Sequence, residues 1–207
     1  MSKKTQRKDV ASNETVGSAL LDAAREIFLN EGVKGLSVRR VAEQAGCTTM
    51  AVYSQFKGKD GILGALFDEG FDMLSLAQQA VDATLNNEEK VIAICQAYRA
   101  TASAYPHHYA LMLGQHSGVH SPSEASQLKA MATLNFLVET VSTMRSMKNQ
   151  SAQESDALAN ALFAFCHGWV SLERTGFLAD SRRNQLAFNR AVASLVRGFL
   201  KAKGKPA

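Results

Sequence analysis

The chain has 207 residues, of which 46% are hydrophobic and 20% are charged, and its formal net charge is +4. This composition excludes a disordered chain, and the length allows one domain or a small domain joined to a larger one. The three cysteines are widely spaced and form no Cys-x-x-Cys pair, so neither a disulfide framework nor a structural zinc site is expected.

The charges are unevenly distributed along the chain. Residues 1–60 carry a net +3, residues 61–181 a net −6 and residues 182–207 a net +7. Residues 33–59 hold five basic residues and one acidic residue, which suits either a polyanionic partner or a solvated surface. The charged N-terminus precedes no apolar stretch, and no run of 18 apolar residues occurs. We therefore expect a cytoplasmic protein that does not bind membranes.

Apolar residues recur at helical spacing along nearly the whole chain, and no alternating strand pattern competes with them. The sequence predicts an all-α fold of about nine helices. The first ends at Gly32, which is a typical C-terminal stop, and the last two are the most apolar. The predicted helices cover residues 16–32, 38–45, 49–56, 62–85, 88–104, 109–115, 123–147, about 158–172 and about 188–200.

Residues 37–59 contain two short predicted helices separated by a three-residue turn that begins with Gly46. This arrangement is typical of a helix-turn-helix. Thr48 is a good N-cap for the second helix, in which Val52 and Phe56 pack inward. A helix fits the major groove of B-DNA and places its N-terminal residues at base edges. The side chains left to project outward are those of Thr49, Met50, Tyr53 and Ser54.

The same region resembles the tetracycline-repressor (TetR) family of transcription regulators over about residues 16–67. Two departures are visible: Gln55 stands where the family often has His, and Asp60-Gly61 stands where it often has two Glu. We expect Gly61 to weaken the start of the following helix. The matching elements are Ala23-Ala24-x-x-Ile27-Phe28, Gly32, Gly35-Leu36-Ser37-Val38, Val41-Ala42-x-x-Ala45-Gly46-Cys47-Thr48 and Val52-Tyr53-x-x-Phe56-x-x-Lys59.

The resemblance implies a three-helix DNA-binding head on a larger helical body. We expect a flexible basic arm at residues 1–14, a helix-turn-helix domain at 15–60 and a ligand-binding and dimerisation domain at 61–202. Ser37 is expected to cap the first helix of the motif beside the DNA backbone, and Arg39 to reach a phosphate or a base.

The resemblance also implies roles for the second helix of the motif and its surroundings. Packing against the next helix is the alternative for Tyr53, and simple solubility is the alternative for Lys59. The implied base-facing residues are Thr49, Met50 and Ser54, and the implied phosphate contacts are Thr48, Tyr53, Lys59 and an uncharged one from Gln55.

Residues 163–177 resemble the penultimate helix of a TetR subgroup with a Trp-His-Gly signature, here with Cys166 in the Trp position. That helix is usually half of a four-helix dimer interface. The resemblance therefore implies a homodimer whose two recognition helices contact a pseudo-palindromic operator in double-stranded DNA. The predicted interface residues are Phe165, Trp169, Leu172, Val192, Leu195 and Phe199.

The body is also expected to enclose a pocket for a small apolar or aromatic ligand. Helix-spaced aromatic and methionine residues line it in this interpretation, although plain core packing is the alternative for each of them. The predicted lining residues are Phe67, Phe71, Met73, Tyr98, Tyr109, Met112, Met131, Phe136 and Phe163.

Four histidines at positions 107, 108, 116 and 120 lie close together in the sequence and could hold a metal. We predict no metal site, because no thiolate pair is present and Gly118 separates the last two at a helix end. His167 and Cys166 point to opposite sides of a helix, so a catalytic pair is not expected.

The leading interpretation is therefore a dimeric repressor, without a cofactor or enzymatic activity, that a small apolar ligand releases from its operator. An activator or a ligand-independent regulator is an alternative. An all-α enzyme or interaction module with a vestigial head is another.

Overall fold

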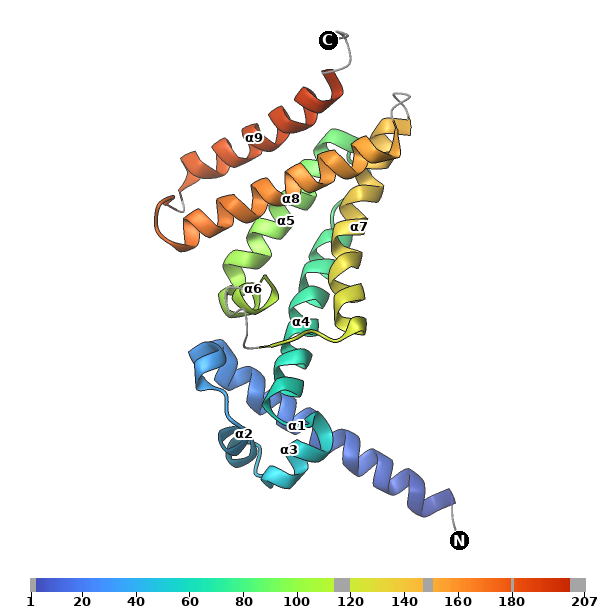
Figure 1. The fold of residues 1–207 in the computed structure, drawn as a ribbon, viewed down its shortest axis with the longest axis vertical. Coiled ribbons are helices and arrows are strands. Elements are labelled where there is room, and N and C mark those ends of the chain that lie inside the picture. Colours follow the sequence, from blue (N-terminus) through green and yellow to red (C-terminus); the bar gives the residue numbers. More distant parts are fainter. Residues whose placement is uncertain (1–2, 114–119, 147–150, 180, 202–207) are drawn as a thin grey trace. The chain divides into compact units, whose positions relative to one another are not determined.

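The structure is a computed structural model that describes residues 3–113, 120–146, 151–179 and 181–201. Within these ranges it contains nine α-helices and no strand (Figure 1). None of the described helices is long and apolar enough to cross a bilayer. The helices are α1 (Lys3–Gly35), α2 (Val38–Gln44), α3 (Thr49–Phe56), α4 (Lys59–Gln79), α5 (Asn87–Ala104), α6 (Pro106–Met112), α7 (Glu124–Ser146), α8 (Ala152–Arg174) and α9 (Arg182–Lys201).

The all-α prediction is confirmed, and several helix ends differ from the predicted ones. Helix α1 begins at Lys3, so the segment predicted as a flexible arm is helical from that residue onward. Helix α6 begins at Pro106 rather than near residue 109, because proline is favoured in the first turn of a helix, where its missing N–H costs nothing. The end predicted for that helix, at residue 115, lies outside the described residues.

Gly32 breaks α1 as predicted, and the chain kinks there before continuing to Gly35. Its φ of 65° lies in the left-handed region that glycine adopts without strain. A Cβ at this position would also lie 2.8 Å from Nδ1 of His107 on α6. The residue therefore provides both the turn at the end of the helix and room for α6 to pack beside it.

The chain forms two compact units, which are described separately. The first contains residues up to Gly70 together with Tyr105–Gln127, and so includes α1–α3, the first part of α4, and α6. This division differs from the predicted boundary after Asp60. Its core includes apolar residues of α1 to α4 that are each at most 3% exposed: Leu20, Ala24, Ile27 and Phe28 of α1, Val41 and Ala42 of α2, Val52 of α3, and Ile62, Leu63 and Leu66 of α4.

The second unit contains Phe71–Ala104 and the residues from Leu128 onward. Helices α5, α8 and α9 pack pairwise against one another in it. A capping box between Ser151 and Glu154 begins α8 by satisfying backbone N–H groups at the helix start. The core along these helices is apolar and includes Val91, Ile94, Leu158, Leu162, Val170, Phe188, Val192 and Val196.

Candidate nucleic-acid interface

Helices α2 and α3 form a helix-turn-helix whose two starts are capped by the predicted residues. The Oγ of Ser37 accepts a hydrogen bond from the backbone N–H of Arg40 at 3.2 Å. The Oγ1 of Thr48 accepts one from the N–H of Ala51, also at 3.2 Å. Each cap satisfies a donor that the first helical turn would leave unpaired. The bounds predicted for α3 are confirmed.

The outward face of α3 is exposed as the sequence predicts. Val52 is fully buried, whereas the side chains of Met50 and Tyr53 are 74% and 54% exposed. Thr49 and Ser54 are exposed as well. The ring of Tyr53 lies against Gly58 in the turn after α3, so only part of it is covered. A short helix with exposed polar and apolar side chains near its start is suited to base edges in a major groove.

The junction between α3 and α4 is tighter than the sequence suggests. Lys57 ends α3 in the left-handed conformation, with φ 62° and ψ 9°, and α4 begins two residues later. A Cβ on Gly61 would lie 1.7 Å from the carbonyl oxygen of Phe56. The expectation that Gly61 weakens the start of α4 stays a prediction, and the structure adds that only a glycine lets the first turn of α4 approach the end of α3.

The predicted phosphate-contacting side chains have different surroundings. The side chain of Arg39 is 83% exposed and makes only a loose 3.3 Å ion pair with Glu43. The ammonium of Lys59 donates to the carbonyl of Val33 at 3.1 Å, where it satisfies an acceptor at the end of α1. Gln55 lies against α1, since its Oε1 is 3.1 Å from the position a Cβ of Gly17 would occupy. Arg39 is thus the most accessible cation of this set.

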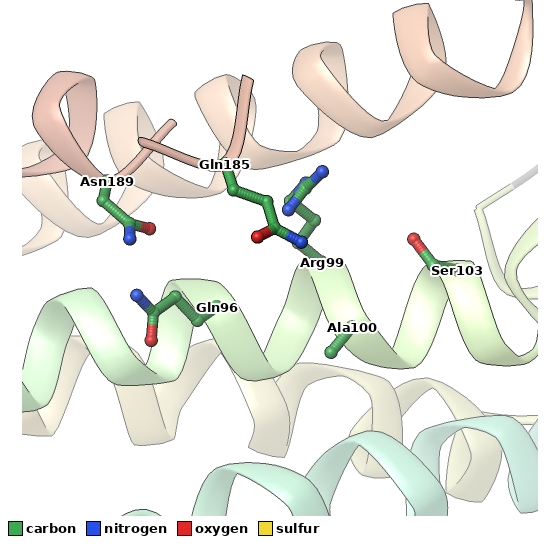
Figure 2. A pocket seen from close by; sticks show the side chains of 6 residues that line it. All are labelled: Gln96, Arg99, Ala100, Ser103, Gln185 and Asn189. Atoms are coloured by element: carbon green, nitrogen blue, oxygen red, sulfur yellow. The ribbon is translucent and has the colours of Figure 1, made fainter. Parts of the chain in front are cut away.

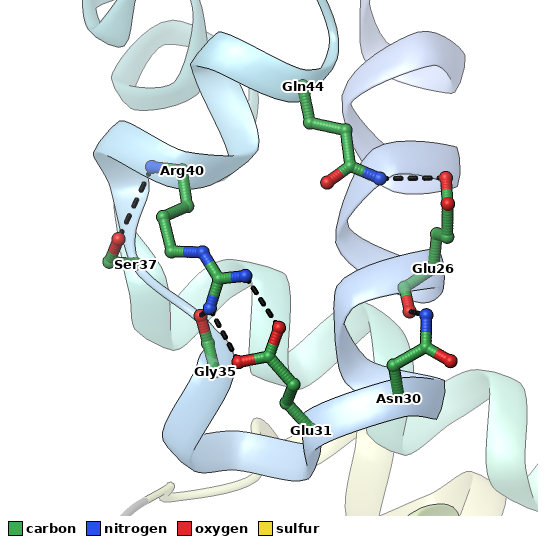
Figure 3. A network of polar contacts seen from close by, with 7 residues as sticks. All are labelled: Glu26, Asn30, Glu31, Gly35, Ser37, Arg40 and Gln44. Carbon is green, nitrogen blue, oxygen red and sulfur yellow. Dashed lines mark hydrogen bonds and ion pairs between the residues drawn. The ribbon is translucent and has the colours of Figure 1, made fainter.

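Arg40 is a functional candidate that sequence reasoning missed. Its guanidinium turns toward α1, and Figure 3 shows it between the carboxylate of Glu31 and the backbone of Gly35. At the other end of α2, Gln44 donates to Glu26 on α1 at 2.7 Å (Figure 3). No sequence motif pairs residues nine apart across a kink, so the periodicity of the chain gave no signal for this contact.

A buried histidine lies where α1, α4 and α6 meet in the first unit. His108 is 1% exposed, and its ring meets Phe28 edge-on with centroids 4.9 Å apart. Its Nε2 is 3.4 Å from Glu69 Oε1, a long contact, while both oxygens of Glu69 accept from Arg25 Nε. Burial lowers the pKa of His108, and the attraction of Glu69 offsets this only in part; Arg25 and His107 lower the pKa further. The imidazole is therefore neutral at neutral pH.

Acid should destabilise the first unit through His108. Because the folded-state pKa lies below the ordinary value of 6.5, the unfolded chain binds the proton more readily. The contribution of His108 to the free energy of unfolding is therefore complete above about pH 6.5. Below that pH it decreases by up to about 1.4 kcal/mol per pH unit. Thermal melting from pH 8 to 5 should show a shallower acid loss for His108→Phe than for the wild type. Equal slopes would contradict this role.

The histidine cluster does not assemble as one site in the described residues. His107 lies beside Gly32, and His120 contacts Asp60 at 2.8 Å through Nδ1. His116 lies outside the described residues. No group of three or more metal-ligating side chains occurs in the part of the chain that the structure describes.

In the second unit, α8 and α9 leave an apolar groove at the surface. Its lining is Phe165, Ala191, Ser194, Leu195, Gly198 and Phe199. Leu172, on the same face of α8 as Phe165, is 46% exposed. Of the predicted interface residues, Val192 is the exception: it is fully buried in the core of the single chain and cannot meet a partner. We correct that assignment.

A second groove, between α5 and α9, is lined mainly by polar side chains. Figure 2 shows it lined by side chains of both helices. Its volume is about 300 Å³. Arg99 in its wall forms a bidentate ion pair with Glu173, with a shortest distance of 2.6 Å, and Trp169 Nε1 donates to the same carboxylate at 3.0 Å. Trp169 therefore has a structural partner. The groove lining is Gln96, Arg99, Ala100, Ser103, Gln185 and Asn189.

The predicted pocket residues divide between the two units, and neither groove is lined by any of them. Met131 is 57% exposed, so we remove it from the predicted lining. Tyr98 and Phe163 meet edge-on with centroids 5.9 Å apart. Phe67, Phe71, Tyr98 and Tyr109 are buried, and Met73, Met112, Phe136 and Phe163 are half-buried.

Comparison with known proteins supports the assignment of the head and the body. The family described as "Bacterial regulatory proteins, tetR family" matches residues 20–66, and the one described as "Tetracyclin repressor-like, C-terminal domain" matches residues 91–195. The HTH-type transcriptional regulator Rv1816 of Mycobacterium tuberculosis is 29% identical over 117 residues, which is 55% of this chain and 50% of that protein. The matched region thus spans about half the length of this curated relative.

Solved structures share the fold. One is a TetR variant from Acinetobacter baumannii in complex with minocycline, at a TM-score of 0.64 and 17% identity, covering 91% of this chain and 98% of that one. Another is the transcriptional regulator FadR from Bacillus subtilis in complex with stearoyl-CoA, at 0.62 and 18%, covering 86% and 96%. With a family match over half of the chain and a capped, exposed α3 in the head, this protein belongs to the TetR family of bacterial regulatory proteins.

Proposed function

We propose that the protein is a homodimeric repressor that binds a pseudo-palindromic operator and is released from it by a small apolar ligand. The observation that supports DNA recognition most directly is the face of α3, where Met50 and Tyr53 are exposed beside the cap of Thr48. In this proposal Thr49, Met50 and Ser54 face bases, while Thr48, Tyr53 and Arg39 contact phosphates. The side chains of Lys59 and Gln55 contact α1. They can contact a phosphate only after they move away from α1.

Dimerisation through α8 and α9 is supported by the small and apolar residues that these helices expose. Apart from its chain neighbours and the nearby backbone of its own helix, a Cβ on Gly168 or on Gly198 would meet nothing within 4 Å. Gly198 lines the apolar groove with Leu195 and Phe199. An exposed apolar surface of this kind favours a partner, and a two-fold dimer buries the same surface of both copies. Two recognition helices about 34–36 Å apart would then contact successive turns of one duplex.

Release by a ligand requires that the ligand bind one state of the dimer more tightly than the other. The buried and half-buried aromatic side chains of the predicted pocket favour an apolar compound. Among proteins of similar fold, one is described in complex with minocycline and another with stearoyl-CoA. These two compounds are therefore suitable first probes for this protein.

The test uses a gel shift with the DNA upstream of the protein's own gene. We expect salt-sensitive binding to a specific site, because neutralised phosphates release counterions. A probe that raises the melting temperature by binding the native state should also release the DNA. Ligand release would be contradicted if the protein binds a specific site and no compound that raises its melting temperature releases the DNA. The repressor proposal would be contradicted if the protein binds no specific site. A reporter gene that the protein switches on would indicate an activator.

A further inference from the structure

Polar contacts tie α2 to α1 at both ends of α2. At its first half, Arg40 Nη2 donates to Glu31 Oε1 at 2.6 Å and Nη1 to Oε2 at 2.7 Å (Figure 3). The same Nη1 donates to the carbonyl of Gly35 at 2.8 Å. At its second half, Gln44 Nε2 donates to Glu26 Oε2 at 2.7 Å. These contacts fix α2 against rotation on the apolar side chains beneath it.

The end of α1 is shaped to receive Arg40. After the kink at Gly32, the chain folds back so closely that a Cβ on Gly35 would lie 2.5 Å from the Cβ of Glu31 and 2.9 Å from its Oε2. The Glu31 carboxylate therefore lies over the backbone of Gly35, where one guanidinium reaches both groups. Planar two-point pairing of this kind fixes direction as well as distance.

Adjacent arginines on α2 thus have opposite surroundings. The side chain of Arg39 is 83% exposed, whereas that of Arg40 is 45% exposed and is directed to the protein's own backbone and carboxylate. The Arg40 guanidinium lowers the pKa of Glu31, and the Glu31 carboxylate raises the pKa of Arg40. Both groups are consequently ionised at neutral pH, and the carboxylate of Glu31 largely neutralises the positive charge of Arg40 that could otherwise attract DNA.

The orientation of α2 is passed on to the recognition helix. The turn after α2 is closed by a hydrogen bond from Cys47 N to the carbonyl of Ala42 at 2.8 Å and by one from Gly46 N to that of Glu43 at 3.2 Å. The next residue is Thr48, the cap of α3. A change in the tilt of α2 therefore moves the start of α3.

We propose that Arg40 and Glu31 are positioning residues for DNA binding, which set the tilt of α2 on α1 and through it the angle at which α3 enters the groove. Neither residue contacts DNA in this proposal. Half-exposed ion pairs contribute little to the free energy of folding, so variants of this pair should remain folded. The pair acts by orienting α2. For removal of the Glu31 charge, this role predicts weaker DNA binding, whereas electrostatic attraction alone predicts equal or tighter binding.

The experiment measures affinity for a duplex selected by the wild-type protein from a random-sequence library. Glu31→Gln removes a negative charge, so charge alone predicts equal or tighter binding to DNA. We expect instead a loss of about tenfold, as for Arg40→Gln, with a similar loss in the double variant because both act through one contact. Glu43→Gln is the matched control, because it removes the exposed partner of Arg39, and it should bind as well as the wild type or better.

The salt dependence separates positioning from direct contact. A positioning role leaves the slope of log affinity against log salt unchanged in Arg40→Gln, whereas loss of a phosphate contact reduces it by about 0.9. Unchanged or tighter binding by Glu31→Gln, or a reduced slope for Arg40→Gln, would each overturn the proposal. The inference rests on DNA binding by the head. The affinity of the wild-type protein tests DNA binding, and the ratio of variant affinity to wild-type affinity tests the positioning role.

Discussion

Replacing Tyr53 with alanine should weaken binding to every DNA sequence by about 10- to 100-fold, which is about 1.4–2.8 kcal/mol. The side chain is exposed on α3, with its ring against the turn at Gly58, and we propose that its hydroxyl contacts a phosphate. Phosphate contacts position a protein on the duplex without sequence information, so the loss should be similar for specific and nonspecific sites. Fluorescence anisotropy with both kinds of duplex measures it.

The matched control is Tyr53→Phe, which keeps the ring and removes only the hydroxyl. It should lose roughly tenfold or less, since a single neutral hydrogen bond contributes about 0.5–1.5 kcal/mol. If Tyr53→Ala binds as the wild type does while its melting temperature is unchanged, the tyrosine is not part of the DNA-binding surface.

Placing a charge at Gly168, a half-buried position of α8, should abolish dimerisation. Gly168→Glu adds a side chain whose Cβ would meet nothing within 4 Å apart from its own chain neighbours and the nearby backbone of α8, so the monomer has room for it, and the helix gains by losing a glycine. In the proposed dimer the two carboxylates would be buried without partners, which costs several kcal/mol. We expect the dimer dissociation constant to rise at least 100-fold in analytical ultracentrifugation, together with a loss of operator affinity.

A control for this experiment is Asn135→Glu, which adds the same charge at an exposed position of α7 and should leave the dimer intact. Trp169→Arg is less informative, because Trp169 packs on Phe188 and donates to Glu173, so its replacement would disturb the fold itself. A Gly168→Glu protein that remains a dimer of unchanged stability would exclude α8 from the interface.

The sequence predicted the helices and the recognition motif because both depend on local signals. The spacing of Val41, Ala42 and Val52 and the capping hydroxyls of Ser37 and Thr48 act within a few residues. For the same reason the exposed face of α3 could be assigned before any coordinates were known. The inward turn of Arg40 could not, because it depends on a kink at Gly32 that brings Glu31 and Gly35 together.

Other differences arise from tertiary packing that periodicity does not describe. Val192 and Leu195 share the apolar stripe of α9, yet Val192 is fully buried and Leu195 lines a surface groove. The apolar stripe of a helix, read from the sequence, does not show which of its residues the neighbouring helices cover. Lys59 fits the family motif for a DNA contact, and only the folded chain shows its ammonium on the carbonyl of Val33.

The close approach at Gly61 has a mechanical consequence. A Cβ at residue 61 would lie only 1.7 Å from the carbonyl oxygen of Phe56. The first turn of α4 and the last turn of α3 are therefore packed with almost no free space between them. We therefore expect a displacement of the first turn of α4 to move the end of α3 as well. Even the single methyl group of alanine at residue 61 would force these two turns apart and change the angle between them.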